Sequence, residues 1–241
     1  MVDNEKDDMV NEVADRVVKK IIGIVIAVVV VFFLLKACVA ILAGVGDIIS
    51  DEVKKMNKSK ELFNTAVILL SEEKYEEGIE YLDEVIELDP SISEAYLYRA
   101  AALSNLGKNE KALSDINKYI ELVPKDYEAY ELRGYILRNM DQWEKSISDL
   151  DIAIENGTNS VSVYYHRGYS YYNLKNYEKA LSDFNTTISM DPYFECGESN
   201  NHCIYYWRGL AYKSLGRKEE ATLDFRKACD FGNEKACKEL K

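Results

Sequence analysis

The sequence between Leu62 and Asn233 repeats one pattern five times, and this repetition limits the folds that the chain can adopt. Successive copies begin 34 residues apart, except the last, which begins after a step of 41 residues. The copies are Leu62–Pro90, Tyr96–Pro124, Tyr130–Thr158, Tyr164–Pro192 and Tyr205–Asn233. A fixed period of this size predicts a stack of helical hairpins, in which each unit packs on its neighbours. Such an array is better suited to binding than to catalysis.

Each copy has two stretches of apolar residues at helical spacing, separated by a short polar break. In the fourth copy, Tyr164 and Leu174 belong to the first stretch, and Phe184 and Ile188 belong to the second. A connection as short as residues 175–177 favours two antiparallel helices.

Small residues recur where the two helices of a hairpin must approach each other. A glycine inside a helix costs about 1 kcal/mol relative to alanine, so its recurrence indicates close packing. The small residues of the first stretches are Ala66, Ala100, Gly134, Gly168 and Gly209, and those of the second are Gly78, Ala112, Ser146, Ala180 and Ala221.

These features resemble the tetratricopeptide repeat, a family with a 34-residue period, an aromatic-Leu-Gly-Tyr first helix and an Ala-Phe-Ala second helix. The resemblance covers about 175 of the 241 residues. It implies an all-α fold, a right-handed α-solenoid of five helical hairpins with a C-terminal capping helix at residues 234–241. The expected repeats are residues 59–92, 93–126, 127–160, 161–194 and 202–233, with an insertion at 195–201.

The copies depart from the family pattern at an arginine that replaces the usual leucine before the small residue. This register holds Arg99, Arg133, Arg167 and Arg208, and an aspartate register in the second helix holds Asp115, Asp149, Asp183 and Asp224. We expect each arginine to pair with an aspartate, within one hairpin or between hairpins. Because both residues repeat in register, we expect them to serve the fold rather than a ligand.

An apolar segment, Ile21–Gly46, precedes the repeats and contains 26 residues with one charge, Lys36. A spanning helix needs roughly 20 predominantly apolar residues. We therefore expect one N-terminal transmembrane helix at residues 21–46, between a polar segment at 1–20 and a linker at 47–58. A cleaved signal peptide is the alternative, although its apolar region usually has only about 7–15 residues.

The charges that flank this segment predict its orientation. Arg16, Lys19 and Lys20 lie directly before it, which favours a cytoplasmic N-terminus. The expected location is a single-pass membrane protein with its repeats on the translocated, extracytoplasmic side. Lys54 and Lys55 lie close to the other end and leave the opposite orientation open.

Tetratricopeptide arrays resemble one another in binding peptides or helices on the inner face of their first helices. The positions of this sequence that correspond to the inner face are rich in tyrosine, a residue that is enriched in interface cores. The alternative is that these rings fill gaps between repeats. Val67 and Ala101 stand where the family's chaperone-tail clamp has asparagines, so that specificity is not carried over. The expected groove residues are Phe63, Leu97, Tyr135, Arg138, Tyr165, Tyr169, Tyr172, Tyr206 and Lys213.

A further register of asparagines consists of Asn105, Asn139 and Asn173. An asparagine amide can bond to the backbone of an extended peptide, because it has both donors and acceptors. It can equally satisfy a carbonyl in the last turn of its own helix. Both readings stay open at this stage.

Four cysteines lie near the last copy, Cys196 and Cys203 beside the insertion and Cys229 and Cys237 near the C-terminus. In an antiparallel hairpin all four would lie at one end of the repeat. Two disulfides would suit an oxidising compartment, and the paired cysteines also resemble those of Sel-one-like repeats. A zinc site with His202 and free thiols are the alternatives, although the CxxC spacing of zinc sites is missing.

Composition and motifs restrict the function further. The net charge of −12 argues against nucleic acid as a partner. The sequence has no phosphate-binding glycine loop, no HExxH and no GxSxG, and neither His166 nor His202 has a repeated acid or nucleophile partner. We therefore expect no enzyme activity and no cofactor. The prediction is a membrane-tethered scaffold that binds a protein or peptide; the alternatives are a self-associating homo-oligomer and a cysteine-based metal or redox module.

Overall fold

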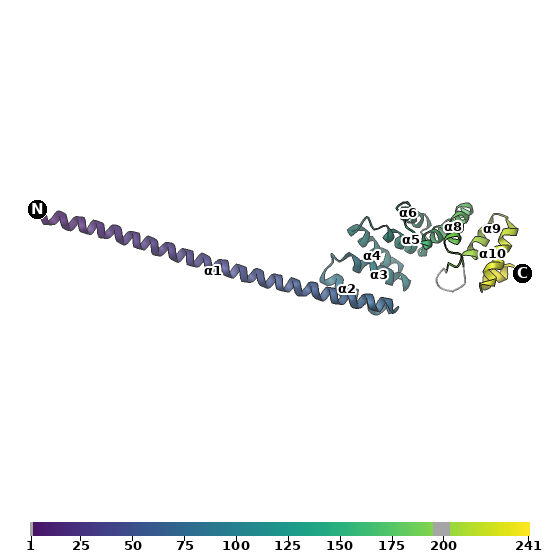
Figure 1. Ribbon diagram of the computed structural model, residues 1–241, viewed down its shortest axis with the longest axis horizontal. Coiled ribbons are helices and arrows are strands. Elements are labelled where there is room, and N and C mark those ends of the chain that lie inside the picture. The colour runs from purple at the N-terminus through teal and green to yellow at the C-terminus, as the bar shows by residue number, and fades with distance from the viewer. Residues whose placement is uncertain (1, 195–202) are drawn as a thin grey trace. The chain divides into compact units, whose positions relative to one another are not determined.

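The computed structural model describes residues 2–194 and 203–241, and its regular elements within these ranges are all α-helices (Figure 1). The all-α prediction is thus confirmed. The chain divides into two compact units, Met1–Lys58 and Ser59–Lys241.

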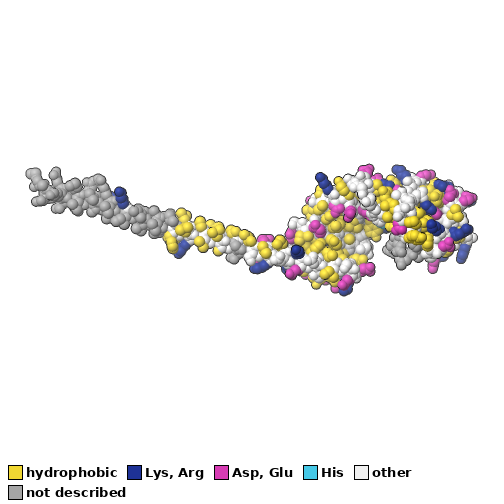
Figure 2. All heavy atoms as spheres, in the orientation of Figure 1, with side chains coloured by type: hydrophobic (Ala, Val, Ile, Leu, Met, Phe, Trp, Pro, Cys, Tyr) yellow, Lys and Arg dark blue, Asp and Glu magenta, His cyan; other side chains and the backbone are white. Residues whose placement is uncertain are grey.

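The described residues of the first unit all belong to α1, a helix that runs from Val2 to Ser71, so that its last residues are part of the second unit. Its described side chains between Phe32 and Val45 are exposed, with Leu42 at 69%, and apolar side chains dominate this stretch in Figure 2. An 18-residue window has a mean hydropathy of 2.1 and no buried residue. By length and composition, this is one helix of the described chain that could cross a membrane.

Residues 47–58, expected as a linker, lie inside α1. The segment contains no glycine or proline that would end the helix. Two ion pairs at helical spacing support it, Asp51 with Lys54 at 3.0 Å and Glu52 with Lys55 at 3.5 Å. The expected connection between two helices is therefore itself helical.

The second unit is a series of antiparallel hairpins, each made of two helices joined by about three residues (Figure 1). The end of α1 pairs with α2, and the following helices pair in chain order before a short last helix. Their bounds are α2 Tyr75–Leu88, α3 Ser93–Asn105, α4 Asn109–Leu122, α5 Tyr127–Asn139, α6 Trp143–Glu155, α7 Val161–Asn173, α8 Tyr177–Met190, α9 Cys203–Ser214, α10 Lys218–Asp230 and α11 Glu234–Glu239.

The turn inside each hairpin places one residue in the left-handed region. These residues are Glu73, Gly107, Asp141, Lys175 and Gly216, with φ between 56° and 74°. They follow the period of the repeat. Only two of the five are glycines, so the tight connection imposes this conformation on residues that adopt it less readily.

The core lies between the two helices of each hairpin and between neighbouring hairpins. The small-residue register is buried, as expected from close helix packing. A Cβ atom added at Gly168 would lie 2.9 Å from the Phe184 ring, and one at Gly134 would lie 2.8 Å from Leu150. Ser146 adds a polar contact at such a crossing and donates to the Gly134 carbonyl at 2.8 Å.

All four arginines of the repeated register pair with the aspartate of their own hairpin. In each case Nε and Nη2 donate to the two carboxylate oxygens at 2.7–2.9 Å, the bidentate geometry that suits a guanidinium. The pairs are Arg99–Asp115, Arg133–Asp149, Arg167–Asp183 and Arg208–Asp224.

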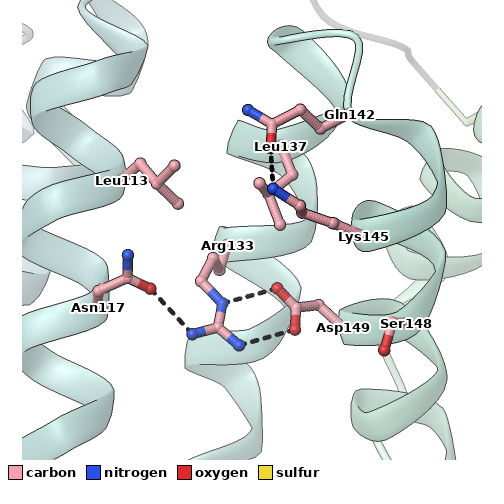
Figure 3. A pocket seen from close by; sticks show the side chains of 8 residues that line it. All are labelled: Leu113, Asn117, Arg133, Leu137, Gln142, Lys145, Ser148 and Asp149. Atoms are coloured by element: carbon pink, nitrogen blue, oxygen red, sulfur yellow. Dashed lines mark hydrogen bonds and ion pairs between the residues drawn. The ribbon is translucent and has the colours of Figure 1, made fainter.

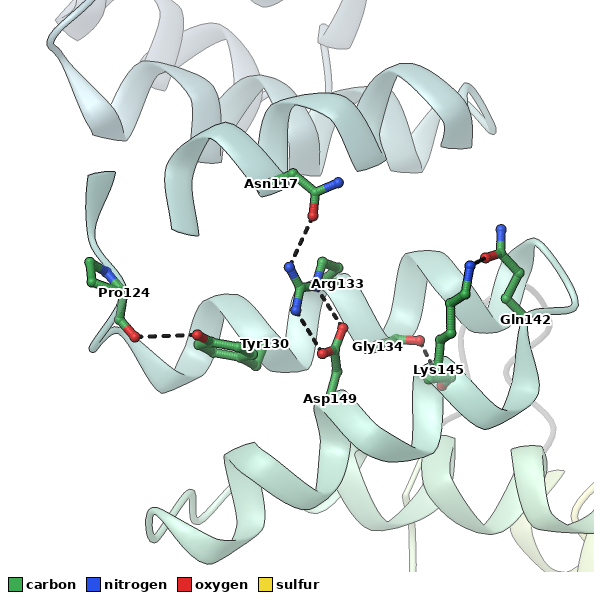
Figure 4. Close-up of polar contacts among 9 residues, drawn as sticks. Asn117, Pro124, Tyr130, Arg133, Gly134, Gln142, Lys145 and Asp149 are labelled. Carbon is green, nitrogen blue, oxygen red and sulfur yellow. Dashed lines mark hydrogen bonds and ion pairs between the residues drawn. The ribbon is translucent and has the colours of Figure 1, made fainter. Parts of the chain in front are cut away.

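The same arginines also link each hairpin to the one before it. Nη1 of Arg133 donates to Asn117 of α4 at 2.9 Å, while Nε and Nη2 hold Asp149 of α6 (Figures 3 and 4). The other arginines reach Asp83, Asp151 and Asn185 at 2.6–2.7 Å. This Arg–Asp ladder, defined by the four bidentate pairs and their Nη1 partners, therefore connects the hairpins along the array.

The C-terminal end of the array is closed by α11. Cys229 of α10 and Cys237 of α11 form a disulfide, and Lys213 of α9 pairs with Glu239 at 2.6 Å. The Asn233 side chain caps α11 by accepting from the Ala236 amide at 3.0 Å. These contacts hold a helix that is too short to be stable alone.

Candidate functional site

A groove of about 1000 Å³ lies in the array and is formed mainly by the first helices of consecutive hairpins. The α3–α4 turn, α5, α7 and α9 all contribute to it. We call it the aromatic groove because four of its residues are tyrosine or tryptophan. Its lining is Ser104, Asn105, Leu106, Gly107, Asn109, Tyr135, Arg138, Asn139, Ser162, Tyr165, His166, Tyr169, Phe194 and Trp207.

Arg138 of α5 lies among three tyrosine rings of the groove. Its guanidinium carbon is 4.9 Å from the centroid of Tyr135, 5.2 Å from Tyr169 and 5.9 Å from Tyr165. Each distance is within the range of a cation–π contact. Nη2 and Nε also donate to Asn139 Oδ1, at 2.8 and 3.3 Å. These contacts hold the guanidinium in one position without neutralising it.

His166 of α7 is the fourth ring beside Arg138. Its Nδ1 lies 3.0 Å from Arg138 Nη1. Because arginine can only donate, Nδ1 accepts and the ring proton is on Nε2. Burial lowers the pKa of His166 well below its usual value, and the nearby Arg138 charge lowers it further. His166 is thus neutral at physiological pH.

Four of the nine groove residues expected from the sequence line the aromatic groove, namely Tyr135, Arg138, Tyr165 and Tyr169. Tyr165 differs from the expected open wall, because it is only 4% exposed and packs against Phe184 and Phe194. It therefore belongs to the floor of the groove, and burial raises its pKa to about 12.

The other five expected residues lie elsewhere in the array. Tyr172 and Tyr206 pack against Trp207 at 5.5 and 5.6 Å between ring centroids. Phe63 stacks edge-on against Tyr98 at 5.5 Å, and Leu97 packs against the core of the second hairpin. Lys213 is engaged by Glu239 of α11, as described above. Tyr172, Tyr206, Phe63 and Leu97 are not part of the groove lining, and their role in binding stays a prediction.

The sequence reasoning missed Trp207, which lines the groove and stacks edge-on against Tyr169 at 4.7 Å. The register directly before the repeated arginine contains Tyr98, Leu132, His166 and Trp207. Its aromatic character could have marked it as part of the same face. His166, for which the sequence indicated no acid or nucleophile partner, lies against Arg138 in the packed array.

The three asparagines of the 105, 139 and 173 register do not share one role. Asn173 donates to the Tyr169 carbonyl at 2.9 Å, the local bond expected at the end of a helix. Asn139 accepts from Arg138, and Asn105 is exposed at the edge of the groove. Identical residues in register thus have different partners, a backbone carbonyl for Asn173 and an arginine for Asn139, each within the asparagine's own helix.

The structure does not favour the zinc alternative for the cysteines. Cys229 and Cys237 are joined to each other, so neither is a thiolate that could bind metal. Cys203 is also disulfide-bonded, whereas Cys196 and His202 lie outside the described residues. Among the residues that the structure describes, no group of three metal-ligating side chains comes together.

The second unit is an α-solenoid. It consists of consecutive antiparallel hairpins with small residues where their helices cross, and the groove on its first helices is a candidate binding face. Comparison with protein families identifies the type of repeat. Matches to the tetratricopeptide repeat cover residues 62–92, 81–114, 161–194 and 204–231. The chain therefore contains tetratricopeptide repeats, and among curated proteins none matches it significantly.

Several solved structures have a similar fold over about three quarters of this chain. A crystal structure of MamA is 25% identical, with a TM-score of 0.62 over 76% of this chain and 97% of that one. MamA from Desulfovibrio magneticus RS-1 is 20% identical, with a TM-score of 0.65 over 73% and 96% of the two chains. YrrB, described as a tetratricopeptide-repeat protein with an unusual peptide-binding site, is 21% identical, with a TM-score of 0.63 over 78% and 96%. These likenesses confirm the solenoid fold.

Proposed function

We propose that this chain is a non-enzymatic scaffold that holds a partner protein by a peptide or helix bound in the aromatic groove. The groove itself supports this most directly, because its volume of about 1000 Å³ is lined by the partly exposed rings of Tyr135, Tyr169 and Trp207 above the buried Tyr165. Such rings offer large contact area with little loss of side-chain freedom. YrrB, which has a peptide-binding site on the same fold, supports the proposal by analogy.

The second part of the proposal is that the N-terminal helix tethers the array to a membrane. The described apolar side chains have no protein covering them, and Phe33 and Ile41 are each 65% exposed. Burying such a surface in lipid would remove it from water. The Cys229–Cys237 disulfide, which ties α11 to α10, supports an oxidising, extracytoplasmic side for the repeats.

The groove can be tested by selecting linear peptides from a displayed random library on the full chain in lipid nanodiscs. We expect the variant Tyr135→Ala, Tyr169→Ala to bind the selected peptides at least about tenfold more weakly, because two contact rings are removed. The matched control is Tyr98→Ala, Tyr193→Ala, which removes two exposed rings outside the groove lining. Equal affinities of both variants and the unaltered chain would exclude this groove.

The tether can be tested by alkaline extraction of membranes that contain the full chain. We expect the unaltered chain to stay in the membrane pellet. Phe33→Arg with Ile41→Arg should release it, since an arginine at the centre of a span, where Phe33 lies, costs about 2.5–3.5 kcal/mol, and Ile41→Arg adds a second charge nearer to its end. Phe33→Leu with Ile41→Leu is the control. Release of the unaltered chain would contradict the tether.

A further inference from the structure

The aromatic groove contains a positive charge that the array does not neutralise. Of the described residues that line it, only Arg138 is charged at neutral pH, since His166 is neutral. All four ladder arginines hold an aspartate through two hydrogen bonds. Within the described residues, Arg138 has no carboxylate at ion-pair distance, and its hydrogen-bond partners are an amide and a neutral imidazole.

The guanidinium of Arg138 also has donors to spare. It has five N–H groups, and hydrogen bonds to Asn139 and His166 use three of them. The Tyr165 hydroxyl also interacts with this guanidinium, and the N–H groups that remain on the terminal nitrogens can donate to a carboxylate oxygen. The three tyrosine rings and Asn139 already restrict the side chain, so little further ordering is required on binding.

Two other polar groups of the groove have no hydrogen-bond partner among the residues that the structure describes. Ser104 is 5% exposed, and its Oγ forms no hydrogen bond. Asn109 Oδ1 is likewise buried without a donor. Ser104 lies near the end of α3 and Asn109 is the first residue of α4, and both line one side of the groove. A buried, unsatisfied polar atom is unfavourable, and the backbone N–H groups of a peptide are suitable donors.

We propose that Arg138 binds a carboxylate of an extended peptide in the aromatic groove, while Asn109 and Ser104 bond to the peptide's polar groups. The inference rests on the proposed function, because it specifies which peptides the groove accepts. A neutral peptide would leave the Arg138 charge desolvated and unpaired, whereas the carboxylate of an acidic peptide would form an ion pair with it. We therefore expect the groove to prefer peptides that carry one carboxylate among uncharged residues.

The test uses the peptides selected on the full chain in nanodiscs. We expect every tight binder to contain an acidic residue whose replacement, Glu to Gln or Asp to Asn, weakens binding at least about tenfold. The Arg138→Gln variant should bind the acidic and the amide peptide equally. Arg138→Lys should keep part of the preference, because it retains the charge without the fork of donors.

Two controls separate charge recognition from other effects. Lys213→Gln removes the other cation expected on this face, which lies outside the groove lining, and should leave the preference unchanged. Arg138→Met keeps much of the apolar bulk packed by the rings, so an unchanged thermal midpoint of this variant shows that the fold persists. Selected peptides synthesised with free and amidated C-termini distinguish a terminal carboxylate from an acidic side chain.

The outcomes are distinguishable. Binders that lack a carboxylate, or an acidic preference that persists in Arg138→Gln, would overturn the role of Arg138 while leaving the groove intact. Selected peptides that bind the Tyr135→Ala, Tyr169→Ala variant normally would instead remove the proposed function, and this inference with it. A preference that Arg138→Gln abolishes and Lys213→Gln preserves supports the proposal.

Discussion

Replacing Asp149 with alanine is expected to lower the free energy of unfolding by about 2–4 kcal/mol, because it leaves a desolvated guanidinium without its carboxylate. The side chains of Asp149 and Arg133 are only 7% and 22% exposed. The remaining polar partner of Arg133 in the ladder is the neutral Asn117. The measurement is chemical denaturation of the detergent-solubilised full chain, followed by circular dichroism.

Asp83→Ala is the matched control for this prediction. Asp83 is the outer partner of Arg99, and its side chain is 57% exposed, so its loss should cost less than about 1 kcal/mol. The double variant Arg133→Leu, Asp149→Leu should be more stable than Asp149→Ala, since no charge is left buried. Equal destabilisation by Asp149→Ala and Asp83→Ala would contradict the structural role of the inner pair.

Phe184→Ala is expected to cost about 3–5 kcal/mol, because the removed ring leaves a cavity between α7 and α8. Phe184 is fully buried, and its ring lies against Gly168, where no Cβ could be accommodated without a shift. The same denaturation experiment measures this effect. If the slope of the free energy of unfolding against denaturant concentration is unchanged, the variant exposes the same area on unfolding as the unaltered chain.

Two variants test the specificity of this effect. Phe184→Leu reproduces the glycine–leucine contact of Gly134 with Leu150 and should cost no more than about 1.5 kcal/mol. Leu223→Ala truncates a side chain of α10 that is 63% exposed and should change stability by about 0.5 kcal/mol or less. If Phe184→Ala cost no more than Leu223→Ala, the α7–α8 contact would not be part of the stabilising core.

The parts of this fold that could be predicted from the sequence are those that repeat. A side chain that recurs every 34 residues meets the same neighbour in each hairpin, so its environment follows from the period. The Arg133–Asp149 pair and the contact between Gly168 and Phe184 are of this kind. The sequence could not predict that Arg133 would also reach Asn117, because the distance between hairpins depends on how they stack.

The groove was harder to predict, because it is built from residues that break the repetition. Tyr165 and Tyr169 share a helix face, yet Tyr165 is buried while Tyr169 is only partly covered. Their exposure depends on Phe194 and Trp207, which come from later parts of the chain. A helical pattern determines which side of a helix a residue occupies, but not which side chain of another hairpin covers it.

The sequence alone determined the class of the fold, the positions of the hairpins and the apolar character of α1. These properties depend on local periodicity and composition, which a linear sequence contains in full. Only the tertiary structure decided that Arg138 has no carboxylate beside it among the described residues. Arg133 faces an aspartate across its own hairpin, whereas Arg138, five residues later on the same helix, faces Tyr135, Tyr169 and His166. The reason is that a charge is balanced through space, by groups that the packing of separate hairpins brings together.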